Sequence, residues 1–240
     1  MKFEPVFYEN RKDDNHCLQA SIMMLLNTLG RRVSWEQVNE FTEYDARYYS
    51  WTPRAVIELN RFIPGVMLWS SLDYKQFAER GEEYFLKHNE NNLSWFETQK
   101  KHASPNFGKE QNASRKLVRE NLVIKKQTHL EDIEKLLRDN LIISVVDAGK
   151  LAQQPRSVGH FVLIFSQTRT SFIIHDPGLP PRRSWSVAKN DFMHSFENEL
   201  IAAPKGRLNF GIEVNRNDAC PCGAKKANGT PIKYKHCHGK

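Results

Sequence analysis

Two short apolar runs, separated by a polar segment, constrain the fold of this chain more than any other feature. They lie within GHFVLIFSQTRTSFIIHDPG (159–178) and read FVLIF and FII. Short runs of aromatic and β-branched residues on either side of a polar turn are typical of an antiparallel β-hairpin. A turn centred near Thr168 would place His160 opposite Asp176, close enough for an imidazole–carboxylate hydrogen bond. The sequence therefore predicts a sheet that carries a His–Asp pair at its end.

The chain around this hairpin has the pattern of an α+β domain. Helices are expected at 18–29, from Trp35 onward, and at 51–62, 128–140 and 187–196, and further strands at 141–146 and 208–214. Residues 74–126 are polar and rich in helix formers, without a visible strand, and we expect a solvated helical insertion that borders the functional cleft. Because helices come first and antiparallel strands afterwards, the pattern predicts N-terminal helices packed on an antiparallel sheet.

The net charge of +7 is concentrated at the C-terminal end. Residues 215–240 contain six Lys or Arg and one Asp, so they carry +5 and leave the rest of the chain nearly neutral. Such a basic segment suits an acidic protein face, ribosomal RNA or another phosphate backbone. No run reaches the roughly 18 apolar residues of a membrane span, and MKFEPVFYEN has no apolar stretch of signal-peptide type. We therefore expect a cytoplasmic protein.

The four cysteines divide into an isolated one and a cluster of three. Cys17 stands alone at the start of the first predicted helix, where the helix dipole and free backbone N–H groups favour a thiolate. Together with His160 and Asp176 it makes the Cys/His/Asp arrangement of nucleophilic catalysis, in which His160 moves the proton and Asp176 orients the imidazole. Taken singly, a buried thiol, a solvated histidine and a turn aspartate are the simpler explanations. Their order and their elements favour catalysis.

These residues also carry a resemblance to a known family. The segments DDNHCLQASIMMLLNTLG, GHFVLIF, FIIHDPGLPP and WSVAKNDFMHSF resemble the papain-like cysteine peptidases. The likeness is closest to the branch that processes double-glycine leader peptides of bacteriocins, and to its free-standing relatives, and it covers residues 5–203. It implies a papain-like fold, thiol-dependent hydrolysis of a peptide or protein substrate, and Cys17, His160 and Asp176 as the catalytic residues.

The chain departs from that family in two places. Many members have Asp-Cys-Gly where this chain has His16, Cys17 and Leu18. The family usually places a Gln a few residues before the Cys to donate to the oxyanion, but here that position is Arg11, with Asn10 beside it. Asn10 has a carboxamide that can donate, although it is shorter than Gln. Loss of one oxyanion donor costs about 2.7–4 kcal/mol of transition-state stabilisation, so a weak or inactive enzyme is the alternative.

The three clustered cysteines indicate a metal site near the C-terminal end. Cys220, Cys222, Cys237 and His238 offer three thiolates and an imidazole, the ligand set of a tetrahedral structural zinc ion, and His236 is an alternative ligand. A redox pair or free surface thiols are the less favoured explanation. The segment CPCGAKKANGTPIKYKHCHG resembles the SEC-C motif of the secretion ATPase, with a longer spacing between the ligand pairs. That resemblance implies a docking module.

Two functions of different classes remain. The first is a cysteine peptidase, formed by residues 1–214, that is docked to an acidic protein or ribosomal RNA by a zinc-binding module of residues 215–240. An acyl transferase is a variant of it, because the thioester intermediate is the same. The second is a catalytically weak or inactive papain-like scaffold that binds a partner through the zinc module. The substrate and the oligomeric state have no readable motif.

Overall fold

The computed structural model describes residues 4–88, 90–155 and 158–205, together with Asn217, 230–233 and His236. Outside the described residues lie the predicted strand at 208–214 and the predicted zinc ligands Cys220, Cys222, Cys237 and His238.

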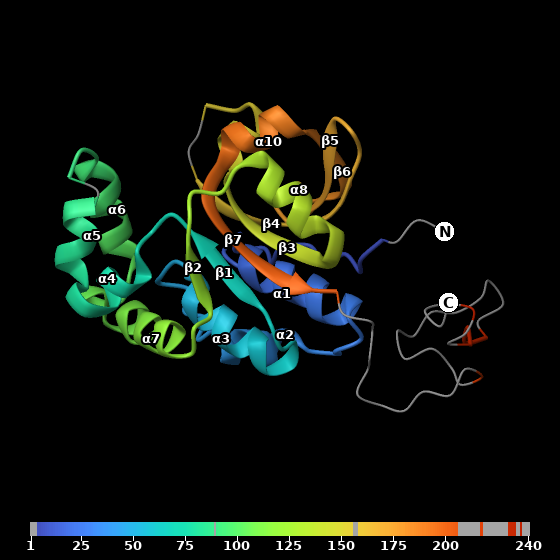
Figure 1. Cartoon of the computed structure of the whole chain (residues 1–240), viewed down its shortest axis with the longest axis horizontal. Coiled ribbons are helices and arrows are strands. Elements are labelled where there is room, and N and C mark those ends of the chain that lie inside the picture. The colour runs from blue at the N-terminus through green and yellow to red at the C-terminus, as the bar shows by residue number, and fades with distance from the viewer. Residues whose placement is uncertain are drawn as a thin grey trace.

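The described part of the chain forms an α+β fold, as the sequence predicts, built on a mixed seven-stranded sheet (Figure 1). The helices are α1 (Cys17–Thr28), α2 (Trp35–Phe41), α3 (Thr52–Phe62), α4 (Tyr74–Arg80), α5 (Glu82–His88), α6 (Leu93–His102), the 3₁₀-helix η1 (Pro105–Phe107), α7 (Gly108–Arg119), α8 (Leu130–Asp139), α9 (Ala148–Ala152) and α10 (Lys189–Ser195). The strands are β1 (Met67–Ser70), β2 (Val123–Lys125), β3 (Asn140–Asp147), β4 (Gly159–Gln167), β5 (Ser171–Asp176), β6 (Arg182–Ala188) and β7 (Phe196–Pro204). Their order across the sheet is β2-β1-β7-β3-β4-β5-β6.

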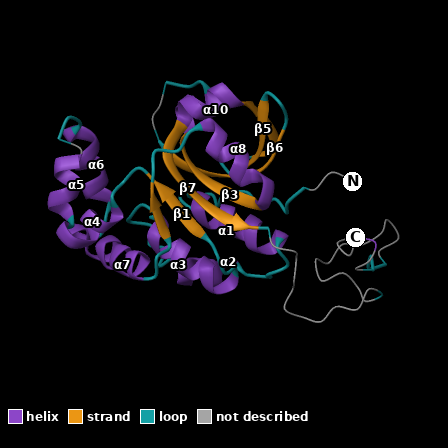
Figure 2. Cartoon of the chain, in the orientation of Figure 1, coloured by secondary structure: helices purple, strands orange, loops and turns teal. Residues whose placement is uncertain are grey.

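Helices cover both faces of the sheet, with α8 and α10 on one side and α1–α3 on the other (Figure 2). In β4, Phe161 and Leu163 belong to the core shared with α1–α3, whereas Val162 and Ile164 belong to the core shared with α8 and α10. This two-sided burial explains why FVLIF is continuously apolar instead of alternating with polar residues.

The N-terminal helices form where the sequence predicts them. At the start of α2, the Ser34 side chain accepts from the Gln37 N–H at 3.3 Å and the Gln37 side chain accepts from the Ser34 N–H at 2.9 Å, which completes the expected capping box. Helix α1 packs on β4, where the Ser21 hydroxyl donates to the Phe161 carbonyl at 3.4 Å. This contact fixes the start of α1 near the start of β4.

The predicted hairpin exists as β4 and β5, but its predicted register is wrong. Leu163 pairs with His175 and Ile164 with Ile174, so continued pairing would set His160 opposite Gly178 and not Asp176. The turn begins at Thr168 instead of centring on it, because the Thr168 hydroxyl accepts from the N–H groups of Thr170 and Ser171 at 3.2 and 3.0 Å. A bulge between Ile164 and Ser166 then shifts the pairing by one residue, back toward the predicted register.

The expectation of an entirely antiparallel sheet without a strand in 74–126 is also wrong. Strand β2 falls within this segment and pairs with β1 in parallel. Parallel neighbours need a long crossover connection, and α4–α7 supply it at one side of the molecule (Figure 1). These helices contribute to an aromatic cluster formed by Trp51, Phe77, Phe85, Phe96 and Phe107, which is continuous with the core shared with α1–α3.

Candidate active site

One cleft is lined by Cys17, His160 and Asp176. Cys17 lies at the start of α1, His160 at the start of β4 and Asp176 at the end of β5. The other residues that line it are Asp14, Ala148, Leu151, Ala152, Gln154, Val158, Gly159, Gly178, Leu179, Pro180 and Arg182. The described residues of 74–126 contribute none of this lining, so the expectation that they border the cleft is wrong. They connect β1 to β2 at the opposite edge of the sheet from β4–β6.

A buried hydrogen bond joins His160 to Asp176. The His160 Nε2 atom donates to Asp176 Oδ1 at 2.7 Å. Burial by itself would lower the pKa of His160, but hydrogen bonds to Asp176 and Cys17 raise it to about 10. Burial would raise the pKa of Asp176, yet the hydrogen bond from His160 holds it below its ordinary value. At neutral pH the pair is therefore an imidazolium beside a carboxylate.

Gly178 lets the two side chains meet despite the register difference. Its N–H donates to Asp176 Oδ1 at 2.8 Å, so the same oxygen accepts from Gly178 and His160. A Cβ atom at Gly178 would lie 2.9 Å from Asp176 Oδ1 and 3.3 Å from His160 Nε2. Position 178 is thus opposite the imidazole and must be free of a side chain, while Asp176 reaches across diagonally.

Cys17 is half-buried in the first turn of α1 and lines the same cleft as His160, whose pKa it helps to raise. Since His160 Nε2 binds Asp176, Nδ1 is the ring nitrogen left for the sulfur. The first N–H groups of an α-helix have no acceptor within the helix, and together with the helix dipole they stabilise an anion at this end. Chemically, this arrangement can hold a thiolate next to an imidazolium.

Asn10, the candidate oxyanion donor, lies outside the lining of this cleft. Its side-chain oxygen accepts from the N–H groups of Arg11 and His16, both at 2.9 Å, and its Nδ2 donates to Asp14 Oδ1 at 3.0 Å. Its backbone N–H donates to the Pro177 carbonyl at 2.8 Å. Asn10 therefore ties the loop before Cys17 to the turn after Asp176. The carboxamide side chain that does line the cleft belongs to Gln154.

His16 and Gln19, on either side of the cysteine, hold α1 to its neighbours. The His16 Nδ1 atom lies 2.9 Å from Asp13 Oδ1, and its Nε2 lies 3.3 Å from Asn39 Nδ2 on α2. The Gln19 amide donates to the Thr42 and Ser50 hydroxyls at 3.1 and 3.0 Å. Neither side chain lines the Cys17 cleft, so their contacts position the helix.

The sequence reasoning missed Gly178, Arg182 and the apolar walls of the cleft. The Asp-Pro-Gly order was the available signal for Gly178, since a Gly after Asp-Pro marks a tight turn. Val158 and Leu179 stand at this cleft with 47% and 48% of their surface exposed, which leaves apolar area for a ligand to cover. No local pattern identifies these two residues, because they come from separate loops.

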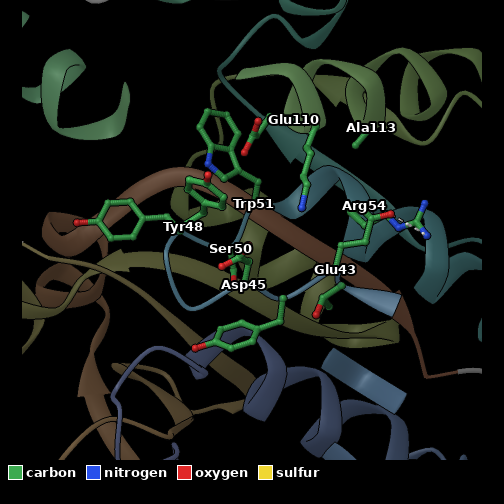
Figure 3. Close-up of a pocket in the computed structure, with 12 residues that line it drawn as sticks. Glu43, Asp45, Tyr48, Ser50, Trp51, Arg54, Glu110 and Ala113 are labelled. Carbon is green, nitrogen blue, oxygen red and sulfur yellow. Dashed lines mark ion pairs between the residues drawn. The ribbon is translucent and has the colours of Figure 1, made fainter. Parts of the chain in front are cut away.

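A second pocket lies between residues 42–51, the start of α3 and the start of α7 (Figure 3). Its labelled lining includes the ion pair of Arg54 with Glu43, at 3.3 Å, and the indole of Trp51. Glu110 lines it too, but its carboxylate already accepts from the N–H and the hydroxyl of Ser104. The pocket shares no lining residue with the Cys17 cleft.

The described residues contain no group of three or more His, Cys, Asp or Glu side chains arranged to hold a metal ion. The four predicted zinc ligands fall outside them, as stated above. In the same part of the chain, no helix has both the length and the apolar character needed to cross a membrane.

Comparison with known proteins finds likeness only over short stretches. No protein-family model matches the chain. It is 54% identical to the protein translocase subunit SecA of Thiobacillus denitrificans over 39 residues, which are 16% of this chain and 4% of SecA. The SecA of Azoarcus sp. is 33% identical over 84 residues, 33% of this chain and 8% of SecA. SecA of Chromobacterium violaceum is 47% identical over 38 residues, 16% of this chain and 4% of SecA.

This chain therefore spans less than a tenth of the curated relatives that it matches. SecA carries the SEC-C motif at its C-terminus, so the likeness fits the presence of a SEC-C element here. It shows no peptidase family.

Proposed function

We propose that this protein is a cysteine peptidase, a thiol-dependent amide hydrolase of papain-like type, that uses Cys17, His160 and Asp176. The observation that carries the proposal is the buried His160–Asp176 hydrogen bond of 2.7 Å in the cleft that also contains Cys17. A thiol at a helix N-terminus, a base in contact with it and a carboxylate that orients the base are the parts of nucleophilic catalysis.

In the proposed reaction the Cys17 thiolate attacks the carbonyl carbon of a peptide bond. The His160 imidazolium protonates the amine as the C–N bond breaks, and a thioester remains on Cys17. Water then attacks the thioester while His160 accepts a proton from it, and expulsion of the thiolate restores the ion pair. Asp176 holds the imidazole with Nε2 bound, so that Nδ1 serves the sulfur and the leaving group.

In the proposed mechanism the free backbone N–H groups at the start of α1 stabilise the oxyanion by hydrogen bonding. Asn10 does not serve this role, because its side chain forms hydrogen bonds within its own loop. A missing side-chain donor lowers the expected rate by roughly 10²–10³. This geometry is what favours the second candidate function, a scaffold with weak or no catalysis that acts as a binding protein through its C-terminal module.

The reactivity of Cys17 decides between the two candidates. We expect iodoacetamide to label Cys17 rapidly at pH 6, where an ordinary thiol with a pKa of about 8.5 is nearly inert. The His160→Ala variant should label about tenfold or more slowly, and His194→Ala, which removes an exposed histidine of α10, should label like the wild type. Mass spectrometry of the Cys17 peptide separates its reaction from that of Cys220, Cys222 and Cys237. Slow labelling of equal rate in wild type and His160→Ala would favour the binding scaffold.

For the C-terminal module the proposal is docking. Cys220, Cys222, Cys237 and His238 would hold a structural zinc ion, and with four protein ligands this ion takes no part in cleavage. The likeness to segments of SecA and the +5 charge of residues 215–240 support a module that binds an acidic protein or ribosomal RNA.

A further inference from the structure

Arg182 is a cation at the rim of the Cys17 cleft, held in place by an aromatic ring. It is the first residue of β6 and pairs in register with Asp176 on β5. Its guanidinium carbon lies 4.1 Å from the centroid of the Trp185 ring. A guanidinium stacked on an indole keeps its N–H groups in one plane at the edge of the ring, which suits bidentate binding of a carboxylate.

Within the described part of the chain, Arg182 forms no ion pair. The two acidic side chains that line the cleft are occupied, Asp14 by Asn10 and Asp176 by His160 and Gly178. The neighbouring Arg183 differs in this respect, because it pairs with Glu4 at 2.9 Å. Among the described residues that line the cleft, the His160 imidazolium is paired with Asp176, whereas the Arg182 guanidinium has no ion-pair partner and is left for a ligand.

Part of the wall around Arg182 is apolar, formed by Ala148, Leu151, Ala152, Val158, Leu179 and Pro180. When a ligand covers such walls, it removes water from the guanidinium, and that desolvation is costly unless an anion accompanies it. The exclusion of water by a bound ligand also strengthens the attraction between the opposite charges. An apolar ligand with a carboxylate would satisfy both parts of the surface.

From this arrangement we infer that Arg182 is a specificity-determining residue, and that the substrates are peptides with a carboxylate-bearing residue near the amide that Cys17 attacks. The inference rests on the proposed function where it names a peptide substrate and an amide that is cleaved. The preference of the cleft for a negatively charged ligand can be measured without catalytic turnover. The competing role for Arg182 is support of Asp176, whose negative charge it also faces across the strand pair.

Two alkylating reagents test the inference in the full chain. Iodoacetate and iodoacetamide react with a thiolate by the same displacement of iodide and differ in one carboxylate. The quantity measured is the ratio of their rate constants at the Cys17 peptide, at low ionic strength. We expect Arg182→Gln to lower the iodoacetate-to-iodoacetamide ratio about fivefold, the effect of one charge at close range in a partly solvated cleft. Arg182→Lys, which keeps the charge, should retain most of the wild-type ratio.

Arg183→Gln is the matched control, because it removes the same charge one residue away, outside the cleft lining. Its ratio should stay close to the wild-type value. An unchanged ratio in Arg182→Gln, or an equal fall in Arg183→Gln, would overturn the inference. Slowing of both reagents by one common factor in Arg182→Gln would assign Arg182 to the support of Asp176 instead.

If the proposed function is wrong, the labelling experiment gives a different result. If Cys17 is not activated, wild-type labelling by iodoacetamide is slow at pH 6, whatever the ratio. The ratio can then be measured near pH 8.5, where an ordinary thiol reacts. A lower ratio in Arg182→Gln at that pH would retain the anion-binding cleft without the peptidase.

Discussion

Gly178 shows at the scale of one residue how closely the backbone must approach the candidate triad. The place where a Cβ atom would stand is 2.9 Å from Asp176 Oδ1, inside van der Waals contact. Gly159, also in the cleft lining and next to His160, has no atom within 4 Å of its own Cβ position. The two glycines therefore line the same cleft but differ in the space available for a side chain.

We expect Gly178→Ala to slow iodoacetamide labelling of Cys17 at pH 6 by about tenfold or more, because the added methyl group pushes Asp176 away from His160. Gly159→Ala should label at nearly the wild-type rate. Thermal unfolding of both variants shows whether the fold is kept. Equal labelling rates in the two alanine variants would mean that the His–Asp contact does not govern the thiol.

His160 should make stability depend on pH in a defined window. Its pKa in the folded protein is about 10, above the ordinary value of 6.5, because of its bonds to Asp176 and Cys17. The native state then binds a proton that the unfolded chain releases, so this contribution is complete below pH 6.5 and is lost as the pH rises toward 10.

The measurement is the difference in unfolding free energy between wild type and His160→Gln from urea titrations across that window. We expect this difference to fall by a few kcal/mol between pH 6.5 and 10. The same comparison in a Cys17→Ser background should give a smaller fall, since the sulfur's contribution is absent. A difference that is constant with pH would rule out a raised pKa at His160.

At the scale of elements, Glu199 joins three of them to the central strand β7. Its carboxylate accepts from the hydroxyls of Thr52 at the start of α3, Ser70 at the end of β1 and Tyr74 at the start of α4, at 2.6, 2.8 and 3.0 Å. Burial raises the pKa of Glu199 above its ordinary value, although these hydrogen bonds oppose the change. The crossover helices are thus attached to the sheet through a carboxylate that is costly to ionise.

Glu199, like His160, has a raised pKa in the folded protein, so its contribution to stability also falls as the pH rises, but over a more acidic range. An acid with a raised folded pKa destabilises the native state as the pH rises from its ordinary value of 4.5 through the raised one. Glu199→Gln removes this titration and keeps the size of the side chain. We expect wild type to lose unfolding free energy relative to Glu199→Gln as the pH rises from 4 to 7. Parallel stability curves for the two proteins would contradict this.

At the scale of the whole molecule, the candidate active site and the C-terminal module draw on separate parts of the chain. Among the described residues, the cleft lining spans 14–182, and the last strand of the sheet, β7, ends at Pro204. Both hydrophobic cores are built from residues that precede 205. The proposed zinc ligands begin at Cys220, after the described cores and cleft lining, so we expect residues 4–204 to fold without them.

A chelator should therefore unfold residues 218–240 and leave the body folded, because metal binding supplies most of the folding free energy of so small a module. A chain truncated near Asn215 should keep wild-type labelling of Cys17 and lose binding to ribosomes or to an acidic protein. That binding should weaken with salt where the basic residues carry it. Loss of Cys17 labelling in a truncated chain that is still folded would show that the module belongs to the active site.

Local sequence patterns were sufficient for the elements that depend on neighbouring residues. The capping box at Ser34, the amphipathic helix α8 and the apolar runs of β3 and β4 all have periodicity or capping chemistry within a dozen residues. The approach of His160 to Asp176 was also predicted, since both lie at the open end of one hairpin. The pairing register was not, because side-chain bonds of Thr168 and a bulge determine where the turn falls.

Tertiary contacts determined the elements and site features that local sequence patterns did not predict. Strand β7 begins FENE, a polar pattern, yet it pairs with both β1 and β3, and hydroxyls from α3, β1 and α4 bind the Glu199 carboxylate there. Strand β6 is a half-exposed edge strand rich in polar residues, and β1 is only four residues long. The sequence by itself determined which residue types could do nucleophilic chemistry, and near which elements they stand. The steric room at Gly178, the place of Asn10 outside the cleft and the position of Arg182 on Trp185 depend on segments far apart in the chain, so only the folded structure decides them.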